Sequence, residues 1–398
     1  MVNGIQILRA LGIGLMTILF PLIAIDDGLP AIAMGVILGA GVLFGAFYTF
    51  VFSRGASRSG VPLFLVWSSI LMLASGFVYL LGHSLVSLLL IAVLGFIPPT
   101  GGIFASALEE GLLSHVPATR RTRVFATYGM LGTSAGAIGA LLAAAPTDIG
   151  LTPAVGRHVL LVTYLLFGLG ATILSVMLWA WERRNPNLFP HLQTSSRSTT
   201  GLGQSRKLVY QLAALFVADS TGSGIVTAPL IIYWLHLHFH MSASHLALLF
   251  FGVDILAAIS FPLAEWISRF IGLLNTAVFT HIPSSILLMM VPFAPNGSVA
   301  AILLLVRAIL VEMDVPTRQS YIAAAVTPDE RVPAASVTSM GKQVGRAIGP
   351  VGGGWMLAVL GPLGPFIGGG AIKIAYDVTL WYSFRRLKIS EHDSELVG

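Results

Sequence analysis

Cysteine is absent from the 398 residues, and charged residues make up only 10% of them. Without cysteine the chain has no disulfide, no thiolate nucleophile and no zinc–cysteine site. Soluble domains carry about 25% charged residues. This chain has too few charged residues to form the polar surface of a soluble protein. The mean hydropathy of +0.86 agrees. The composition predicts a membrane protein and excludes soluble enzymes, disordered chains and disulfide scaffolds.

Apolar runs of about 20 residues, the length that crosses a bilayer as a helix, recur along the sequence. They predict an all-α polytopic membrane protein with twelve transmembrane helices. The predicted spans are 5–25, 31–52, 62–82, 84–107, 122–145, 157–181, 207–235, 242–264, 272–292, 297–320, 334–359 and 362–386. The first run follows a single arginine and leads at once to further spans, so we predict a retained helix rather than a cleaved signal peptide.

Basic residues gather in alternate loops between the predicted spans. Arg120, Arg121 and Arg123 lie in one such loop, and Arg183 and Arg184 begin the next. Loops rich in Lys and Arg face the cytoplasm, so we expect both termini to be cytoplasmic and the protein to lie in the cytoplasmic (inner or plasma) membrane. The pI of about 9.6 then reflects orientation and contact with anionic lipid rather than nucleic-acid binding.

The longest polar stretch divides the chain into two groups of six predicted helices. It covers residues 182–206 and is rich in Ser, Thr, Gly, Asn and Pro, the composition of a flexible linker. We therefore expect an N-terminal six-helix bundle at 1–181, a C-terminal six-helix bundle at 207–388 and a cytoplasmic tail at 389–398.

The two halves carry similar signals at equivalent places. A proline three residues before an arginine precedes the predicted fifth and eleventh helices, at Pro117 and Pro328. Spaced glycines then follow in each helix: Gly132, Gly136 and Gly139, and Gly341, Gly345 and Gly349. Parallel six-helix repeats are a transporter architecture. Small residues let helices approach closely, so we expect these glycines to let the two bundles approach each other and rock.

Several stretches resemble motifs of the major facilitator superfamily. Arg54-Gly-Ala-Ser-Arg58 follows the second span but lacks the aspartate of the family motif, and Glu265-Trp-Ile-Ser-Arg269 follows the eighth. Gly345-Arg-Ala-Ile-Gly349-Pro350 looks like the glycine–proline signature of drug/proton antiporters, displaced from the fifth helix to the eleventh. The stretch 313–321 looks like a branch of prokaryotic permeases of unknown substrate. The resemblance implies the fold of that superfamily and secondary transport.

Ionisable side chains at membrane depth are candidates for function. The predicted C-terminal bundle holds six of them: Asp219, Asp254, Arg307, Arg346, Lys373 and Asp377. The N-terminal bundle offers polar neutral side chains at comparable depth, including Tyr48 and Tyr128.

We assign proton coupling to Asp219 and Asp254, because buried acids form proton relays in membrane transporters. Arg346 and Arg307 are predicted to bind substrate together with the two tyrosines, since arginine suits bidentate binding of a carboxylate or phosphate. Lys373 and Asp377 are four residues apart on one helix and are predicted to form a structural ion pair. The alternative is that all six charges form a static network that fixes helix packing.

A second set of charges lies at the predicted cytoplasmic helix ends and is assigned to gating. Its members are Arg54, Arg58, Glu109, Glu110, Arg120, Arg123, Glu265, Arg269, Asp314 and Arg331. An ion-pair latch between the glutamates and the neighbouring arginines is one interpretation, and a solvated charged loop is the other. In the fourth span, Pro98 to Gly102 must interrupt the helix, either as a simple kink or as backbone that lines a cavity.

These features predict a secondary active transporter that moves a small solute by alternating access, coupled to protons, as a drug or solute efflux antiporter. The alternative is a proton symporter that imports an organic anion or zwitterion, and a remote alternative is an intramembrane enzyme. We expect a monomer whose partners are the solute, protons and lipid, with no cofactor, metal or nucleic acid. The histidines at 236, 238, 240 and 245 lack a nearby carboxylate and are poor evidence for a metal site.

Overall fold

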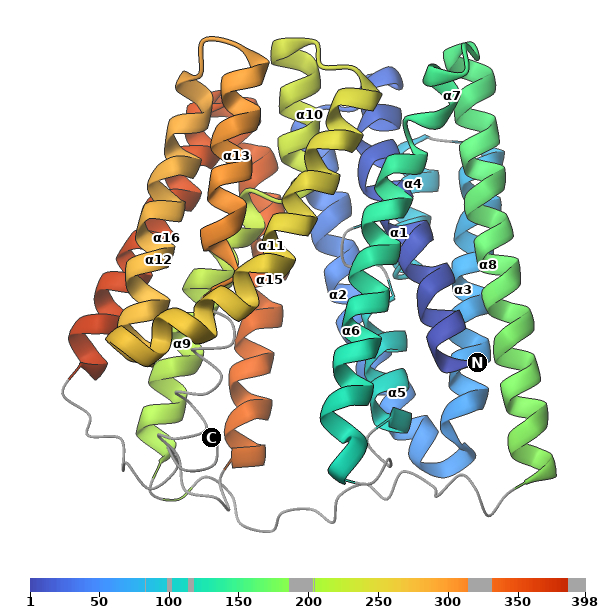
Figure 1. Cartoon of the computed structure of the whole chain (residues 1–398). Coiled ribbons are helices and arrows are strands. Elements are labelled where there is room, and N and C mark those ends of the chain that lie inside the picture. The colour runs from blue at the N-terminus through green and yellow to red at the C-terminus, as the bar shows by residue number, and fades with distance from the viewer. Residues whose placement is uncertain are drawn as a thin grey trace. The chain divides into compact units, whose positions relative to one another are not determined.

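The computed structural model describes residues 1–82, 84–98, 102–113, 118–185, 203, 205–313 and 331–385. Over these residues the elements are helices, and no strand occurs among them (Figure 1). The helices are α1 (Val2–Asp26), α2 (Ala31–Ser59), α3 (Val61–Leu81), α4 (Leu85–Val93), α5 (Ile103–Leu113), α6 (Ala118–Leu142), α7 (Ala145–Asp148), α8 (Pro153–Arg184), α9 (Arg206–Ile225), α10 (Ala228–Phe239), α11 (Ala243–Ile271), α12 (Leu273–Met290), the 3-10 helix η2 (Val291–Phe293), α13 (Gly297–Val311), α15 (Arg331–Leu360) and α16 (Leu363–Phe384).

Apolar length makes many of these helices candidates to cross a membrane. Seven candidate spans among the described residues have the necessary length and hydropathy. Large apolar side chains such as Leu166, Ile259 and Ile302 are exposed on their surfaces, as expected of helices solvated by lipid chains. An all-helical membrane protein is therefore confirmed, while the count of twelve spans and the cytoplasmic termini stay predictions.

Two predicted spans are interrupted in the structure. The break expected around Pro98 is confirmed, because α4 ends at Val93 and α5 begins at Ile103. The span predicted at 207–235 corresponds to one candidate span, Arg206–Phe239, but it is interrupted, since α9 ends at Ile225 and α10 begins at Ala228. Pro229 in the first turn of α10 explains the second break, because proline lacks the N–H that a continuous helix would need there.

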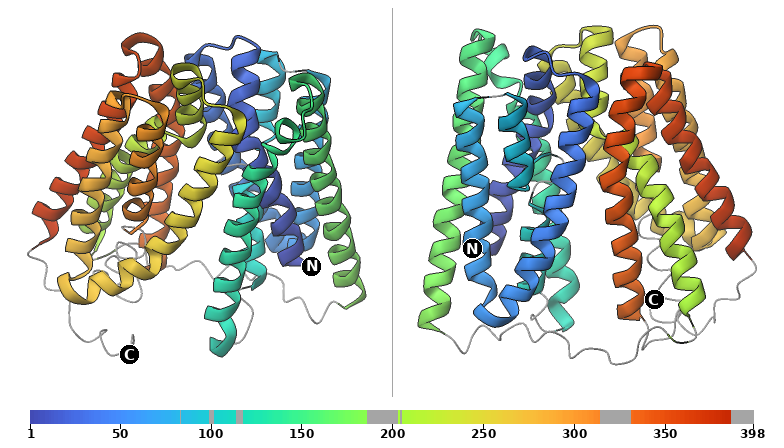
Figure 2. Two further views of the ribbon diagram at one scale, coloured as in Figure 1. Left: turned by 45° about the horizontal axis from the view of Figure 1, so that its top comes forward. Right: turned by 180° about the vertical axis from the view of Figure 1, so that it is seen from behind.

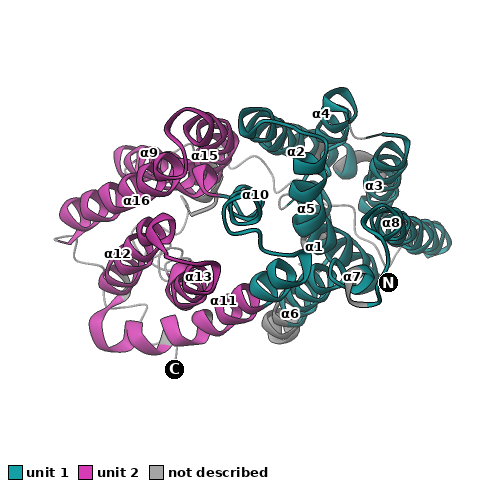
Figure 3. Cartoon of the chain, turned by 90° about the horizontal axis from the view of Figure 1, so that it is seen from above, with its two compact units in different colours: residues 1–197, 227–251 teal, residues 198–226, 252–398 magenta. Residues whose placement is uncertain are grey.

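The helices fall into two compact units, which Figure 3 colours separately. Unit 1 contains residues 1–197 and 227–251, and unit 2 contains residues 198–226 and 252–398. Within unit 1, the Tyr233 hydroxyl of α10 donates a 3.1 Å hydrogen bond to the carbonyl of Leu29, between α1 and α2. The division into linker, tail and two six-helix bundles at the boundaries given above stays a prediction.

Glycines set the closest helix contacts inside each unit. In unit 1, α6 packs on α1, where a side chain at Gly139 would collide with the backbone of Leu11. In unit 2, α9 and α15 run side by side (Figure 2, right), and a side chain on Gly349 would collide with Gly224. Gly139 and Gly349 therefore join helices within a unit, while the expectation that the glycines let two bundles approach and rock stays a prediction. Small residues serve both arrangements, and only the packing distinguishes them.

Candidate functional site

Arg9 of α1, Glu109 of α5 and Tyr128 of α6 meet inside unit 1. The Arg9 guanidinium donates a hydrogen bond to Glu109 Oε2 at 2.6 Å, and the Tyr128 hydroxyl donates to the same oxygen at 2.5 Å. The Glu109 side chain is completely buried, and that of Arg9 is 8% exposed. Because breaking a buried ion pair leaves an uncompensated charge, this cluster couples three helices of the unit tightly.

This buried cluster retains unused hydrogen-bonding capacity. Glu109 Oε1, Arg9 Nε and the side-chain oxygen of the adjacent Gln6 are buried and have no hydrogen-bond partner among the described residues. The Gln6 amide nitrogen instead donates to the Tyr128 carbonyl at 2.8 Å. Unpaired buried polar atoms are unfavourable, so the site suits a water molecule or a polar ligand group that both donates and accepts.

The interruption of the fourth span lies against this cluster. Gly102 has a φ of +72°, and a side chain there would approach Arg9 Cδ to 3.0 Å. Its N–H donates across the break to the carbonyl of Gly95 at 3.0 Å. The broken backbone therefore makes room for the Arg9 side chain, which is the buried setting that a membrane protein tolerates for irregular backbone.

The sequence interpretation missed this pair. Arg9 enters the sequence analysis only as the single arginine at the first span and Glu109 only as part of a cytoplasmic latch, but both are buried and bound to each other. Glu109 reaches α1 because the helix restarts at Ile103, so the carboxylate lies two turns beyond the break. The sequence did hold a signal for this pair: Arg9 lies in the first predicted span, and Glu109 follows the break in the fourth. Tyr128 is bound to Glu109, and its role with substrate stays a prediction.

Tyr48, the other predicted substrate tyrosine, belongs to an aromatic cluster of unit 1. Its half-buried ring lies 5.2 Å from that of Phe104 and 5.6 Å from that of Phe52. Phe96 also packs on Phe104, with ring centroids 5.6 Å apart. These residues come from α2, α5 and the break between α4 and α5. They give the surroundings of Gly95 an apolar, aromatic lining.

Unit 2 contains a buried ion pair between α16 and α9. Lys373 Nζ donates to Asp219 Oδ1 at 3.2 Å and to the Ser223 hydroxyl at 2.6 Å. The Lys373 side chain is 3% exposed and the Asp219 side chain is 8% exposed. The predicted partner of Lys373 was Asp377, and the structure corrects this choice. Close packing at Gly222, where α9 touches the Lys373 stem, directs the ammonium to α9 rather than along its own helix.

Asp377 is bound instead to His281 of α12, a residue that the sequence interpretation missed. His281 Nδ1 lies 3.0 and 2.9 Å from the two carboxylate oxygens of Asp377. Both side chains are 2% exposed. A lone histidine in an apolar run is weak evidence by itself, but Thr280, Ser284 and Ser285 on the same helix are also buried and reveal a polar face.

The remaining predicted charges of unit 2 are more accessible. Arg346 on α15 is exposed, while Asp254 on α11 and Arg307 on α13 are half-buried. Arg307 Nε has no hydrogen-bond partner among the described residues. Glu312 interacts electrostatically with both Asp254 and Arg307. The assignments of Asp254 to proton coupling and of the arginines to substrate stay predictions.

Most of the predicted gating residues lie outside the described side chains or segments. These are Arg54, Arg58, Glu110, Arg120, Arg123, Glu265, Asp314 and Arg331. Arg269 is exposed near the end of α11. A cytoplasmic latch therefore stays a prediction, now without Glu109.

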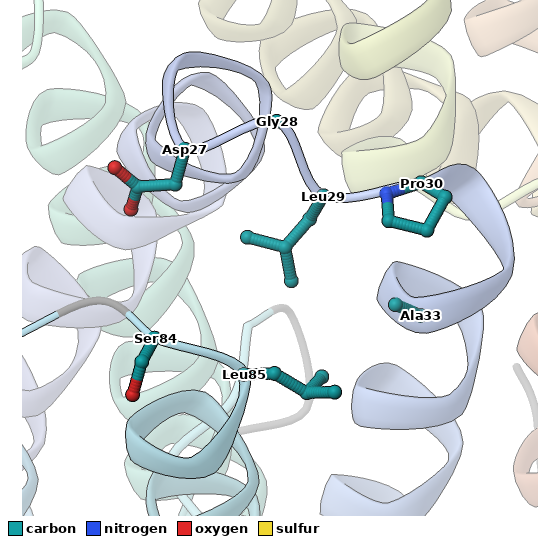
Figure 4. Close-up of a pocket in the computed structure, with 7 residues that line it drawn as sticks. All are labelled: Asp27, Gly28, Leu29, Pro30, Ala33, Ser84 and Leu85. Atoms are coloured by element: carbon teal, nitrogen blue, oxygen red, sulfur yellow. The ribbon is translucent and has the colours of Figure 1, made fainter.

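Unit 1 also carries a separate pocket of about 480 Å³, lined mainly by the connection between α1 and α2 and by the start of α4 (Figure 4). Asp27, Leu29 and Ser84 are among its lining residues. Next to it, Arg157 of α8 pairs with Asp26. No sequence-predicted site residue lines this pocket.

Three of the four histidines at 236–245 make local contacts. His236 Nδ1 lies 2.7 Å from the Met241 carbonyl, and the His245 ring bonds to Ser242. His238 stacks on Trp234. No group of three or more metal-binding side chains is found in the described part of the chain.

Comparisons with known proteins extend these observations. The family model described as Major Facilitator Superfamily matches residues 212–396. The structure is similar to that of a bacterial homolog of the human lysosomal transporter Spinster in an inward-facing and occupied conformation. The TM-score is 0.72 at 15% identity, covering 97% of this chain and 96% of that one.

The family model matches the C-terminal part of this chain, and the solved structure shows the same fold over 97% of it. The nucleoside transporter NupG has the same fold, with a TM-score of 0.69 at 12% identity over 97% of this chain and 99% of that one. An uncharacterized membrane protein of Saccharomyces cerevisiae is 25% identical over 321 residues, covering 72% of this chain and 71% of that protein. Similarity to this superfamily is consistent with transport rather than catalysis, and membership of a prokaryotic permease branch stays a prediction.

Proposed function

We propose that this protein is a proton-coupled secondary transporter that moves a small solute by alternating access, with efflux by antiport as its direction. The observation that carries the proposal is the buried Lys373–Asp219 pair, which joins α16 to α9 close to the break before α10. Discontinuous helices beside buried charges are typical of transport sites. The superfamily and the fold support the same class of activity.

Proton coupling follows from the charge on the buried acid. Asp219 as a carboxylate holds the Lys373 ammonium, and a proton on Asp219 would remove that attraction and release the lysine. The Arg9–Glu109 pair offers the same chemistry in unit 1. Asp254 is the second proposed coupling acid, since it is half-buried near a further carboxylate, Glu312.

Substrate contact is assigned to Arg346, Arg307, Tyr48 and Tyr128. Arg346 is exposed in unit 2, and its guanidinium is suited to a carboxylate or phosphate. The aromatic lining around Tyr48 suits a planar or apolar part of the same solute. These features fit an amphipathic anion or zwitterion, so import of such a solute by proton symport remains the second candidate function.

A substrate screen followed by vesicle flux tests the proposal. Organic anions and zwitterions are the first candidates because they suit the exposed Arg346, and amphipathic drugs and nucleosides come next, the latter because the similar fold of NupG belongs to a nucleoside transporter. Compounds that raise the melting temperature of the purified protein are then tested for movement into or out of sealed proteoliposomes. A bound compound that never crosses the membrane, with or without a pH gradient, contradicts transport. Its chemical conversion by the protein in detergent would favour an intramembrane enzyme.

A further inference from the structure

We propose that His281 and Asp377 form a proton-binding dyad whose charge determines which acid holds Lys373. The proposal rests on the transport function proposed above and adds a second titratable site to unit 2. It starts from a contact between α12 and α16 that links residues 96 positions apart in the sequence.

The geometry requires a proton between the two side chains. His281 Nδ1 lies within 3.0 Å of both carboxylate oxygens of Asp377. A charged carboxylate only accepts hydrogen bonds, so Nδ1 must carry the hydrogen that it donates. Whether a second proton occupies Nε2 then decides whether the dyad is neutral or carries one negative charge.

Burial favours the neutral dyad. Both side chains are 2% exposed, and an uncompensated charge at such a site is strongly unfavourable. The other charged groups that act on Asp377 are Lys373 on the same helix and Asp219 on α9. Arg307 of α13, which also packs on α12, interacts with Glu312 instead.

Lys373 does not supply the missing charge in the observed arrangement. Its ammonium donates to Asp219 and Ser223, and no ion pair within 4.0 Å joins it to Asp377 among the described contacts. The imidazolium of His281 is therefore the cation that balances Asp377. The buried polar face of α12 is consistent with such a site, since the hydroxyls of Ser284 and Ser285 have no hydrogen-bond partner in the described part of the chain.

Loss of the proton to water would change the partner of Lys373. The dyad would then carry one negative charge, and Lys373 lies one helical turn from Asp377, within reach of a flexible lysine side chain. A shift of the ammonium toward Asp377 would break its bonds to Asp219 and Ser223 on α9. The dyad would thus control the link between α16 and the end of α9, where the helix is interrupted.

Nuclear magnetic resonance of the full-length protein in lipid nanodiscs, with ¹⁵N-labelled histidine, tests the charge state directly. The His281 signal is assigned by its loss in His281→Gln, and His158→Gln on the exposed part of α8 is the matched control. We expect hydrogens on both His281 ring nitrogens at neutral pH in the wild type, and a neutral ring in Asp377→Asn. A neutral His281 ring in the wild type overturns the proposal, whatever the variants do.

Stability measurements test the pairing of His281 with Asp377. His281→Gln should lower the melting temperature by about 5 °C, and Asp377→Asn in the same chain should restore most of it, because no unbalanced carboxylate is left. Absence of this rescue contradicts the dyad. These readouts need no substrate, so a charged His281 ring without any solute flux rejects the transport function alone, and flux with a neutral His281 ring rejects the dyad alone.

Discussion

Lys373 on α16 donates hydrogen bonds to Asp219 and Ser223, at 3.2 and 2.6 Å, within the last two turns of α9, which ends at Ile225. The interaction connects two helices of unit 2 at a place where the backbone is already interrupted. Protonation of Asp219, or a shift of Lys373 toward another carboxylate, would weaken this connection. The predictions that follow test this pair, its counterpart in unit 1, the glycine contacts and the proposed substrate arginine.

Lys373→Ala should destabilise the protein by about 3 kcal/mol, because it leaves a buried carboxylate without its cation. Adding Asp219→Asn should recover part of that loss, which a double-mutant cycle on melting curves would measure. The double variant Lys373→Ala with Asp377→Ala is the matched comparison and should show no such recovery. Equal recovery from both acids would show that Asp219 is not the preferred partner.

Glu109→Gln should also destabilise the protein by about 3 kcal/mol, since the buried Arg9 guanidinium would lose its counter-ion. The double change Arg9→Gln with Glu109→Gln should be less damaging than Glu109→Gln alone. Arg157→Gln removes an ion pair whose Asp26 side chain is 51% exposed and serves as the control, with an effect below about 1 kcal/mol. Similar losses in the exposed and buried variants would argue against a structural role for the buried pair.

Gly349→Ala should be strongly destabilising, because its Cβ would collide with the backbone of Gly224 on α9. Gly45→Ala on α2 is the matched control, since a Cβ there meets no atom within 4 Å. Replacing an unhindered helical glycine by alanine is neutral or stabilising by up to about 1 kcal/mol. Melting temperatures of the two variants decide the question. An unchanged melting temperature in Gly349→Ala would show that α9 and α15 are not closely packed there.

Arg346→Lys should fold and melt like the wild type, because Arg346 is exposed on α15. It should nevertheless lose most of the affinity for an anionic solute, about tenfold or more, since lysine cannot reproduce bidentate binding. Titration calorimetry on the purified variant measures this, with Arg157→Lys as the control outside the proposed site. Unchanged affinity in Arg346→Lys would remove Arg346 from the substrate assignment.

Local sequence signals were sufficient for the helical architecture and for the break near Pro98, because apolar length and proline chemistry act within a short segment. The break between α9 and α10 also had a signal in Pro229, but the surrounding apolar run concealed it. Glycine spacing correctly indicated close packing, although it could not say which helix lay opposite.

Ion-pair partners were harder to predict because they depend on which helix faces share a contact. Spacing along α16 favoured Asp377 as the partner of Lys373, yet the close approach of α9 brought Asp219 nearer. His281 carries no fixed charge and lies in an apolar run, so only the contact between α12 and α16 reveals it. The same reason explains why the sequence did not predict the pairing of Arg9 with Glu109.

Solute accumulation by proteoliposomes under an imposed pH gradient, compared with solute exchange in its absence, tests the central claim of proton coupling most directly. We predict that Asp219→Asn abolishes gradient-driven accumulation and retains exchange, because the carboxamide cannot take up and release a proton. Asp254→Asn, measured in parallel, tests the second proposed coupling acid. Accumulation at the wild-type rate in both variants would contradict proton coupling through these acids.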